Sequence, residues 1–138
     1  MEKKSSAVKG LGEIALRAKD LDSLQRFYED VVGLELMKRF PHAAFFRIAD
    51  GYGGHTQILA LFDRSKDLDH EHPDSAKSTI DHLAFGIDLA DFQSEKRRLE
   101  ELGLDVKIAE HDWVHWRSIY FHDLEGNLVE FVTYDTSV

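Results

Sequence analysis

Four polar side chains in this sequence are of the types that bind divalent metal ions: Glu13, Gln57, His82 and Glu130. Carboxylate and amide oxygens and the imidazole nitrogen all serve as ligands for such ions. Glu130 lies within an alternating apolar segment, where a carboxylate is costly unless it is paired or coordinates a cation. We expect the four side chains to converge on one cavity if the segments that carry them pack together.

The segments that would position these residues occur twice in the chain. Residues 13–21, EIALRAKDL, return as residues 82–89, HLAFGIDL, and each copy continues into a helical pattern that ends in Gly-Leu. Such a repeat indicates a duplicated supersecondary unit. Glu13 and His82 take the same place in the two copies, so the repeat makes them matching candidate ligands.

Each copy predicts one strand, one helix and three further strands, which is an α+β unit of the βαβββ type. The strands are predicted by apolar alternation and the helices by apolar residues three or four positions apart. Asp20 or Asp22 would cap the first helix, and Gly33 would end it. The predicted strands are residues 13–18, 34–39, 43–49 and 56–62, then 80–87, 105–110, 117–122 and 128–134, and the second helix spans 91–102.

The apolar positions predict which side chains are buried in the second copy. Phe92, Leu99 and Leu102 share the inward side of the helical pattern. Tyr120 and Phe121 lie in an apolar strand, and we expect both in the core.

The domain organisation follows from these ranges. We expect residues 1–10 to be a disordered tail, residues 11–62 to form the first βαβββ unit and residues 79–135 the second. Residues 63–78 are polar and contain Pro73, and we expect them to be the linker between the units.

Composition narrows the class of protein. The 138 residues include no Cys, which excludes disulfides, thiolate catalysis and Cys-based metal sites. The net charge of −9 argues against nucleic acid and anionic membranes as partners. No apolar run approaches the ~20 residues of a membrane span, and the start lacks a signal sequence. We therefore expect a cytoplasmic protein with a small-molecule substrate.

A family resemblance runs through most of residues 12–134. The segments that carry it are residues 13–21, 27–28, 32–34, 81–85 and 120–131. The last of these reads YFHDLEGNLVEF and is the most specific. Together the segments resemble the vicinal oxygen chelate superfamily, which includes glyoxalases, epimerases, extradiol dioxygenases and the fosfomycin and bleomycin resistance proteins.

The resemblance implies one U-shaped mixed sheet around a cavity, with the helices on its outer face. It implies a divalent ion held there by His82 and Glu130, with Glu13 where His or Gln is usual. Gln57 would be a fourth ligand, whereas a register slip of two residues would put Leu59 there and leave three. The ion would be Ni, Co, Zn, Mn, Mg or Fe. The family also implies a homodimer, in some members with units exchanged between chains.

The ligand set favours one kind of chemistry within the family. Extradiol dioxygenases use two His and one carboxylate for Fe(II), and Glu13 replaces one of those His residues. We therefore expect a glyoxalase-like isomerase, lyase or epimerase that works through an enolate on a small oxygen-rich substrate. Glu130 would be a ligand and catalytic base, and Glu13 the second candidate base. A metal-free protein that sequesters its ligand, as bleomycin resistance proteins do, is the alternative, and a dioxygenase comes third.

Three further groups of residues also carry side chains that could bind a ligand or a metal ion. Trp116 and Arg117 enter a strand near the expected cavity mouth, and one of them is a candidate contact for a substrate ring or carboxylate. Edge-strand packing and surface charge are the favoured explanation of both. His55 is an alternative ligand beside Gln57. The run HEHPD at residues 70–74 has metal-binding residue types, but the polar linker offers no helix or strand to fix their geometry.

Overall fold

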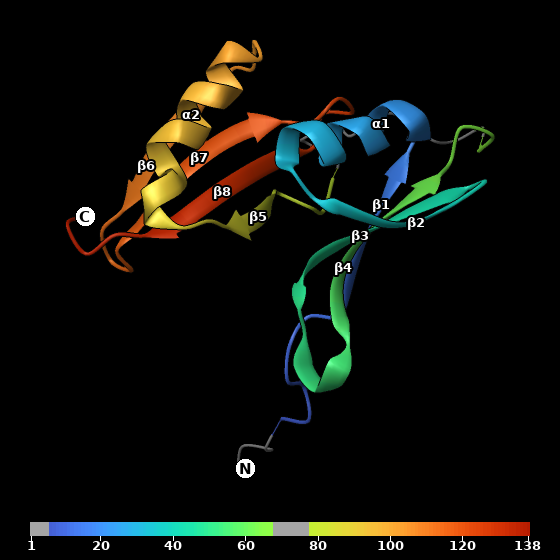
Figure 1. Cartoon of the computed structure of the whole chain (residues 1–138), viewed down its shortest axis with the longest axis horizontal. Helices are drawn as coiled ribbons and strands as arrows, with labels where there is room; N and C mark the ends of the chain where they lie inside the picture. The colour runs from blue at the N-terminus through green and yellow to red at the C-terminus, as the bar shows by residue number, and fades with distance from the viewer. Residues whose placement is uncertain (1–5, 68–77) are drawn as a thin grey trace. The chain divides into compact units, whose positions relative to one another are not determined.

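The chain folds into two compact units, Met1–His70 and Glu71–Val138, and each has its own sheet and helix (Figure 1). The computed structural model describes residues 6–67 and 78–138. Most of the predicted linker, including the 70–74 cluster, lies outside these described residues. No helix in the described parts of the chain is long and apolar enough to cross a membrane.

The first unit is a four-stranded mixed sheet with one helix. Its strands follow the order β1-β4-β3-β2, with β1 and β4 parallel and the other pairs antiparallel. The elements are β1 Glu13–Ala18, α1 Leu21–Phe27, β2 Glu35–Phe40, β3 Ala43–Asp50 and β4 Thr56–Asp63.

The second unit repeats this topology. Its strands follow the order β5-β8-β7-β6, again with the first and last strands parallel. The elements are β5 Leu83–Gly86, α2 Phe92–Glu101, β6 Lys107–His111, β7 Trp116–His122 and β8 Leu128–Tyr134. The α+β class and the two βαβββ units are therefore confirmed. The U-shaped cup that both sheets would form together stays a prediction.

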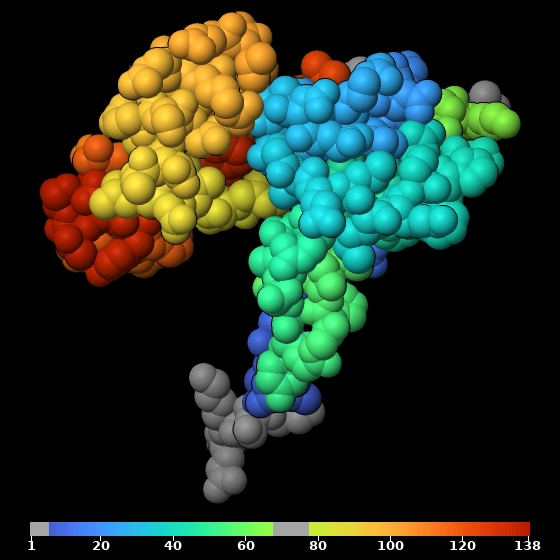
Figure 2. Space-filling model, in the orientation of Figure 1, coloured from blue at the N-terminus to red at the C-terminus, as the bar shows by residue number. Residues whose placement is uncertain are grey.

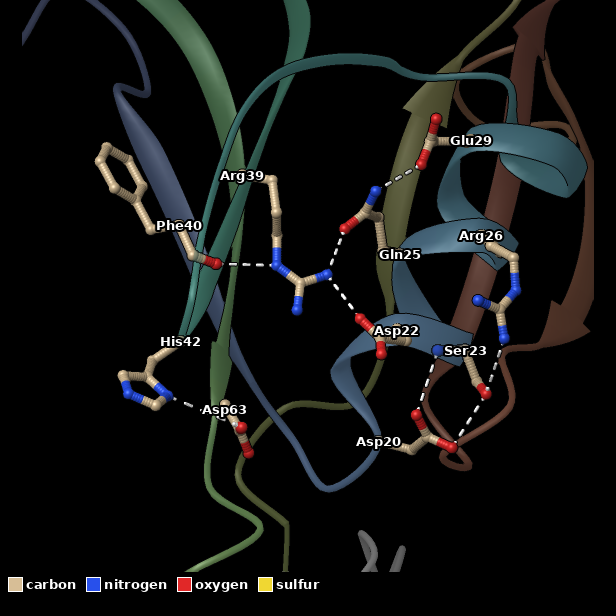
Figure 3. Close-up of polar contacts among 10 residues, drawn as sticks. All are labelled: Asp20, Asp22, Ser23, Gln25, Arg26, Glu29, Arg39, Phe40, His42 and Asp63. Carbon is tan, nitrogen blue, oxygen red and sulfur yellow. Dashed lines mark hydrogen bonds and ion pairs between the residues drawn. The ribbon is translucent and has the colours of Figure 1, made fainter.

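The sequence signals at the ends of α1 act as expected. Asp20 is the N-cap, and its carboxylate accepts hydrogen bonds from the backbone N–H and the hydroxyl of Ser23 at 3.1 and 2.9 Å (Figure 3). After Phe27 the helix continues as a π-helical turn, Tyr28–Val32, and ends at Gly33 with φ +87°. A side chain at Gly33 would be strained by this left-handed backbone, which is why glycine ends the helix.

A polar tie joins α1 to the edge strand β2. The guanidinium of Arg39 donates to Gln25 Oε1 at 2.6 Å and pairs with Asp22 Oδ1 at 2.7 Å (Figure 3). Beneath this tie, Leu24 and Tyr28 are fully buried against the sheet residue Phe46, whose ring centroid lies 6.2 Å from that of Tyr28. The helix thus covers one face of the first sheet.

In the second unit α2 covers one face of its sheet (Figure 2). Phe92 and Leu99 of the helix are buried, as expected from the apolar pattern. Leu102 was expected inward and is 54% exposed, so that prediction was wrong. The helix ends at Glu101, so Leu102 is its C-cap and lies beyond the buried helical positions, and the left-handed Gly103 (φ +85°) turns the chain directly after it.

Candidate active site

Strand alternation gives the second sheet a helix-covered face and an open face. Ile119, Phe121 and Phe131 are buried on the helix-covered face, and the Arg117 guanidinium on that face lies 5.6 Å from the Phe92 ring. The open face of unit 2 is defined by the alternate positions Ala84, Lys107, Ala109, His111, Trp116, Ser118, Tyr120, His122, Leu128, Glu130, Val132 and Tyr134. His82 precedes β5 by one residue and shares this face with Ala84.

The Glu130 carboxylate is the centre of the open face. The residue is only 5% exposed, although it lies among apolar neighbours on β8. Its Oε1 lies 3.0 Å from His82 Nε2, and its Oε2 accepts a hydrogen bond of 2.6 Å from the Ser118 hydroxyl. Both oxygens are therefore oriented by neighbouring strands, which offsets the cost of burying the charge.

The His82 imidazole lies between two carboxylates. Nδ1 is 2.6 Å from Asp81 Oδ1, on the side away from Glu130. Each ring nitrogen thus faces a carboxylate oxygen, Nδ1 that of Asp81 and Nε2 that of Glu130. Histidines that bind metals characteristically donate their second N–H to a carboxylate. The arrangement at His82 has this form, with Nε2 directed at the site.

Tyr120 lies beside this pair rather than in the core. Its ring meets His82 edge-on at 6.0 Å, and its hydroxyl is 3.3 Å from His111 Nε2. Burial, followed by the negative charge of Glu130, raises the pKa of the Tyr120 phenol above its ordinary value. The phenol thus stays protonated and can donate a hydrogen bond at neutral pH. The prediction of a core position for Tyr120 was wrong, whereas Phe121 is buried as expected.

The two predicted substrate contacts lie on opposite faces of β7. Trp116 is on the open face and 43% exposed. Arg117 is on the helix-covered face, where its guanidinium pairs with Asp135 at 3.3 Å and Glu110 at 3.4 Å. The alternation of a strand imposes this separation on any two consecutive residues. Trp116 is therefore placed to contact a ligand on the open face, and Arg117 ties β6, β7 and the end of β8 together.

The first unit presents a different open face. Glu13 begins β1, is exposed and pairs in register with Ile58. Within the described residues Glu13 forms no ion pair. Ala15 pairs with Ala60 as Ala84 pairs with Glu130, so Ala60 is the counterpart of Glu130 in unit 1.

The same register decides where Gln57 lies. Ile58 shares a face with Glu13, so Gln57 shares the opposite, helix-covered face with Leu59 and Leu61. His55 precedes β4 and lies against Gly12, where an added Cβ would meet its ring at 3.4 Å. The structure therefore brings neither residue to the face of Glu13, and the register gives Gln57 no support as a ligand.

The open face offers two ligand atoms of the kinds that divalent ions bind. His82 Nε2 and Glu130 Oε1 supply one nitrogen and one oxygen. Two ligand atoms bound side by side to one ion at about 2.1 Å lie about 3.0 Å apart, and this is the spacing of the pair. Within each described stretch, residues 6–67 and residues 78–138, no group of three metal-binding side chains occurs. The pair fits two positions of a metal site, and a third must be added to it.

Comparison with known proteins gives the family. Residues 10–131 match the model of the Glyoxalase/Bleomycin resistance protein/Dioxygenase superfamily. The chain belongs to this superfamily. Membership accounts for the repeated βαβββ unit and for the resemblance carried by residues 120–131, which form β7, its turn and β8.

Individual members of the superfamily resemble the chain over most of its length. The metallothiol transferase FosB of Staphylococcus epidermidis is 28% identical over 91% of this chain and 82% of its own. A lactoylglutathione lyase from Agrobacterium tumefaciens is 29% identical, covers 93% of this chain and 96% of its own, and has a TM-score of 0.63. The fosfomycin resistance protein FosX from Mesorhizobium loti is 26% identical, covers 94% and 96%, and has a TM-score of 0.64.

Three residues of the site were not singled out from the sequence as functional: Asp81, Ser118 and Tyr120. Asp81 could have been found because it directly precedes a candidate ligand. Ser118 and Tyr120 share the alternation that carries Trp116 towards the open face. Their common face with Glu130 depends on the pairing of β7 with β8, which the superfamily scaffold sets.

Proposed function

We propose that the chain is a divalent-metal-dependent enzyme that acts on a small oxygen-rich molecule. His82 and Glu130 would hold the ion, and Glu13 would complete the site from the same chain or a second copy. The observation that carries the proposal is the buried Glu130 carboxylate, whose Oε1 lies 3.0 Å from His82 Nε2 while Ser118 engages Oε2. The metallothiol transferase name of a relative supports a metal in this scaffold.

Each residue of the site has a definable task. When bound, the ion would polarise a carbonyl or hydroxyl oxygen of the substrate. Asp81 holds the His82 ring, and Ser118 holds the carboxylate, so both ligand atoms keep their direction. The protonated Tyr120 phenol donates a hydrogen bond to a substrate oxygen on the same face.

Proton transfer next to that oxygen is the first candidate reaction, of the isomerase, lyase or epimerase type. Both oxygens of Glu130 are engaged, whereas Glu13 is exposed and has no ion pair within the described residues. Glu13 is therefore the freer base. The similarity to a lactoylglutathione lyase supports this reaction type.

Transfer of a thiol to a metal-bound substrate is the second candidate. The specific support is the 28% identity to a metallothiol transferase over 91% of the chain. Assays with a 2-oxoaldehyde plus thiol and with an epoxide plus thiol separate the two: isomerised product supports the first and ring-opened adduct the second.

The metal proposal itself is tested by binding. We expect Mn²⁺, Co²⁺, Ni²⁺ or Zn²⁺ to raise the melting temperature of the purified protein, because an ion that binds only the folded state stabilises it. His82→Ala and Glu130→Gln should abolish the shift, while His42→Ala, an exposed histidine of unit 1, should retain it. If none of these ions binds the wild type, the protein is a metal-free binding protein and the enzyme proposal fails.

A third variant assigns the role of Glu13. Glu13→Gln should weaken metal binding if the carboxylate is a ligand. It should leave metal affinity unchanged and lower kcat if the carboxylate is the base. An unchanged affinity and unchanged kcat would remove Glu13 from the proposal.

A further inference from the structure

The Tyr120 hydroxyl contacts a histidine that has no role in the proposed reaction. His111 Nε2 lies 3.3 Å from this hydroxyl, and His111 is half-buried at the end of β6. The two residues lie on neighbouring antiparallel strands, β6 and β7. The contact therefore joins β6 to the side chain that lies beside His82.

The strand register shows that this contact crosses a gap between small side chains. His111 pairs with Trp116, which lies four residues before Tyr120 on β7, and four residues of strand span about 13 Å. Between these positions, on the same face, lie Ala109 and Ser118, which pair with each other. Because both are small, the long side chains of His111 and Tyr120 can lean over them and meet.

The Tyr120 ring also lies beside the proposed metal pair. The ring meets His82 edge-on at 6.0 Å, and Tyr120 is the register partner of Glu130. Burial and the negative charge of Glu130 raise the pKa of the Tyr120 phenol, so the phenol keeps its proton at neutral pH. The phenol can donate this one proton and can accept through its oxygen.

The direction of the hydrogen bond between His111 and Tyr120 decides what the phenol can do. If Nε2 accepts the phenol proton, the hydroxyl has none left for a substrate. Nε2 carries a proton in the charged ring and in one of the neutral tautomers, and it then donates to the phenol oxygen. The negative charge of Glu130 favours this second arrangement, because it attracts the phenol proton to its own side.

We infer that His111 is a positioning residue, which donates from Nε2 to the Tyr120 oxygen and so directs the phenol O–H at a substrate oxygen beside the metal pair. The inference rests on the proposed metal site and adds a residue of β6 to it. Tyr120 touches the substrate, and His111 acts only through Tyr120. A donor fixed in this way stabilises negative charge that develops on the substrate oxygen, because it needs no reorganisation when the charge forms. Hydrogen bonds linked in a chain also polarise one another, so the donation from His111 strengthens the phenol as a donor.

Binding of acetohydroxamate to the Zn²⁺-loaded protein tests the pair without an activity assay. Its two oxygens chelate zinc and accept hydrogen bonds. Tyr120→Phe should weaken acetohydroxamate binding about tenfold, because it removes the hydroxyl and keeps the ring. His111→Ala should weaken binding about threefold, because the phenol remains but is no longer directed. The double variant should bind no more weakly than Tyr120→Phe alone, because His111 acts only through the phenol.

Matched variants separate positioning from a structural role. His111→Gln should retain most of the affinity for acetohydroxamate, because an amide N–H can donate to the same phenol oxygen. Tyr134→Phe removes an exposed hydroxyl from the same face and should leave the affinity unchanged. The Zn²⁺ affinity of every variant should equal that of the wild type, because none of these residues binds the ion.

The inference and the metal proposal fail in different ways. Tighter acetohydroxamate binding by His111→Ala would show that His111 accepts the phenol proton, and additive losses in the double variant would show that it acts independently of Tyr120. Either result overturns the inference and leaves the metal site standing, as does an unchanged affinity in Tyr120→Phe. Weaker Zn²⁺ binding by His111→Ala would make His111 a ligand or a support of the sheet, which also overturns it. If the wild type binds no Zn²⁺, the metal proposal fails and this inference fails with it.

Discussion

The two units share one topology and carry different side chains at a matching position of the open face. In unit 2 the residue opposite Ala84 is Glu130, with Ser118 and His82 on its oxygens. In unit 1 the residue opposite Ala15 is Ala60, which is fully buried. The duplicated scaffold therefore keeps the small residue on its first strand and varies the side chain beside it.

The side chains around this position are apolar in unit 1 and polar in unit 2. Around Ala60 lie the aromatic rings of Phe40, Phe45 and Phe62, with successive centroids 5.8 Å apart in edge-on contact. Around Glu130 lie hydroxyl, phenol and imidazole groups. Unit 1 thus offers an apolar wall with Glu13 at its end, and unit 2 offers the polar groups that bind and orient. Each sheet packs against its own helix, so the open face of one unit can change without altering the core of the other.

The largest effect is expected when a carboxylate is introduced into unit 1 at the position that matches Glu130. Ala60→Glu should lower the free energy of unfolding by about 3 kcal/mol or more, because the buried carboxylate would lie among phenylalanine rings and gain no hydrogen bond from a hydroxyl or imidazole group. Urea denaturation measures the change. Ala90→Glu, at an exposed position, is the control and should stay within about 0.5 kcal/mol. A tolerated Ala60→Glu would mean that the open face of unit 1 is not apolar in solution.

The reverse substitution, Glu130→Ala, gives unit 2 the alanine that unit 1 has at Ala60. Glu130→Ala should weaken divalent metal affinity by at least about 100-fold, because removing a ligand costs more than removing a residue that orients it. Calorimetric titration with Mn²⁺ or Zn²⁺ measures the affinity. An unchanged affinity in this variant would place the metal elsewhere.

A smaller effect is expected from the residues that orient the ligands. Asp81→Ala and Ser118→Ala should each weaken metal affinity by about tenfold, within the range for outer-shell partners. Asp88→Ala, an exposed carboxylate of the same unit, should have no effect. If either variant matches the loss in Glu130→Ala, the residue binds the ion directly.

The smallest effect concerns the helices. Asp20 caps α1 through its side chain, whereas Asp91 makes no such bond at the start of α2. Asp20→Ala should cost about 1 kcal/mol and Asp91→Ala only a few tenths, as measured by urea denaturation. Equal losses would show that the side-chain hydrogen bonds of Asp20 do not contribute to stability.

The same cap predicts a pH dependence. The hydrogen bonds from Ser23 lower the pKa of Asp20 below its usual 3.8. A carboxyl with a lowered folded-state pKa stabilises the protein above its unfolded pKa, and the contribution is lost as the pH falls through the folded value. The difference between wild type and Asp20→Ala should therefore shrink below about pH 4 and stay constant above it.

The sequence predicted what depends on local pattern. Alternation placed every strand end within three residues of its observed position, and Asp20 and Gly33 marked the limits of the first helical segment. Glu130 was recognised because a carboxylate in an apolar strand needs a partner. These features depend on residues close together in the chain.

The errors depend on pairing between distant strands. Gln57 shares a face with Leu59 and Leu61 as expected, but only the register of β1 with β4 shows that this is the face opposite Glu13. In β3 the register shifts between Arg47 and Ala49, and such a bulge leaves no clear mark in the sequence. Tyr120 was expected in the core because its strand is apolar, and its position on the open face follows from its pairing with Glu130.

The parallel pairing of first and last strands has a consequence for how the protein forms during synthesis. Ala15 can pair with Ala60, and Ala84 with Glu130, only after the residues between them have left the ribosome. Such long-range closure is slow compared with hairpin or helix formation. His82 is therefore made early and meets its carboxylate only when β8 docks, as the final step of its own unit. We expect ribosome-bound chains that stop before β8 to hold a folded first unit and an unfolded second one.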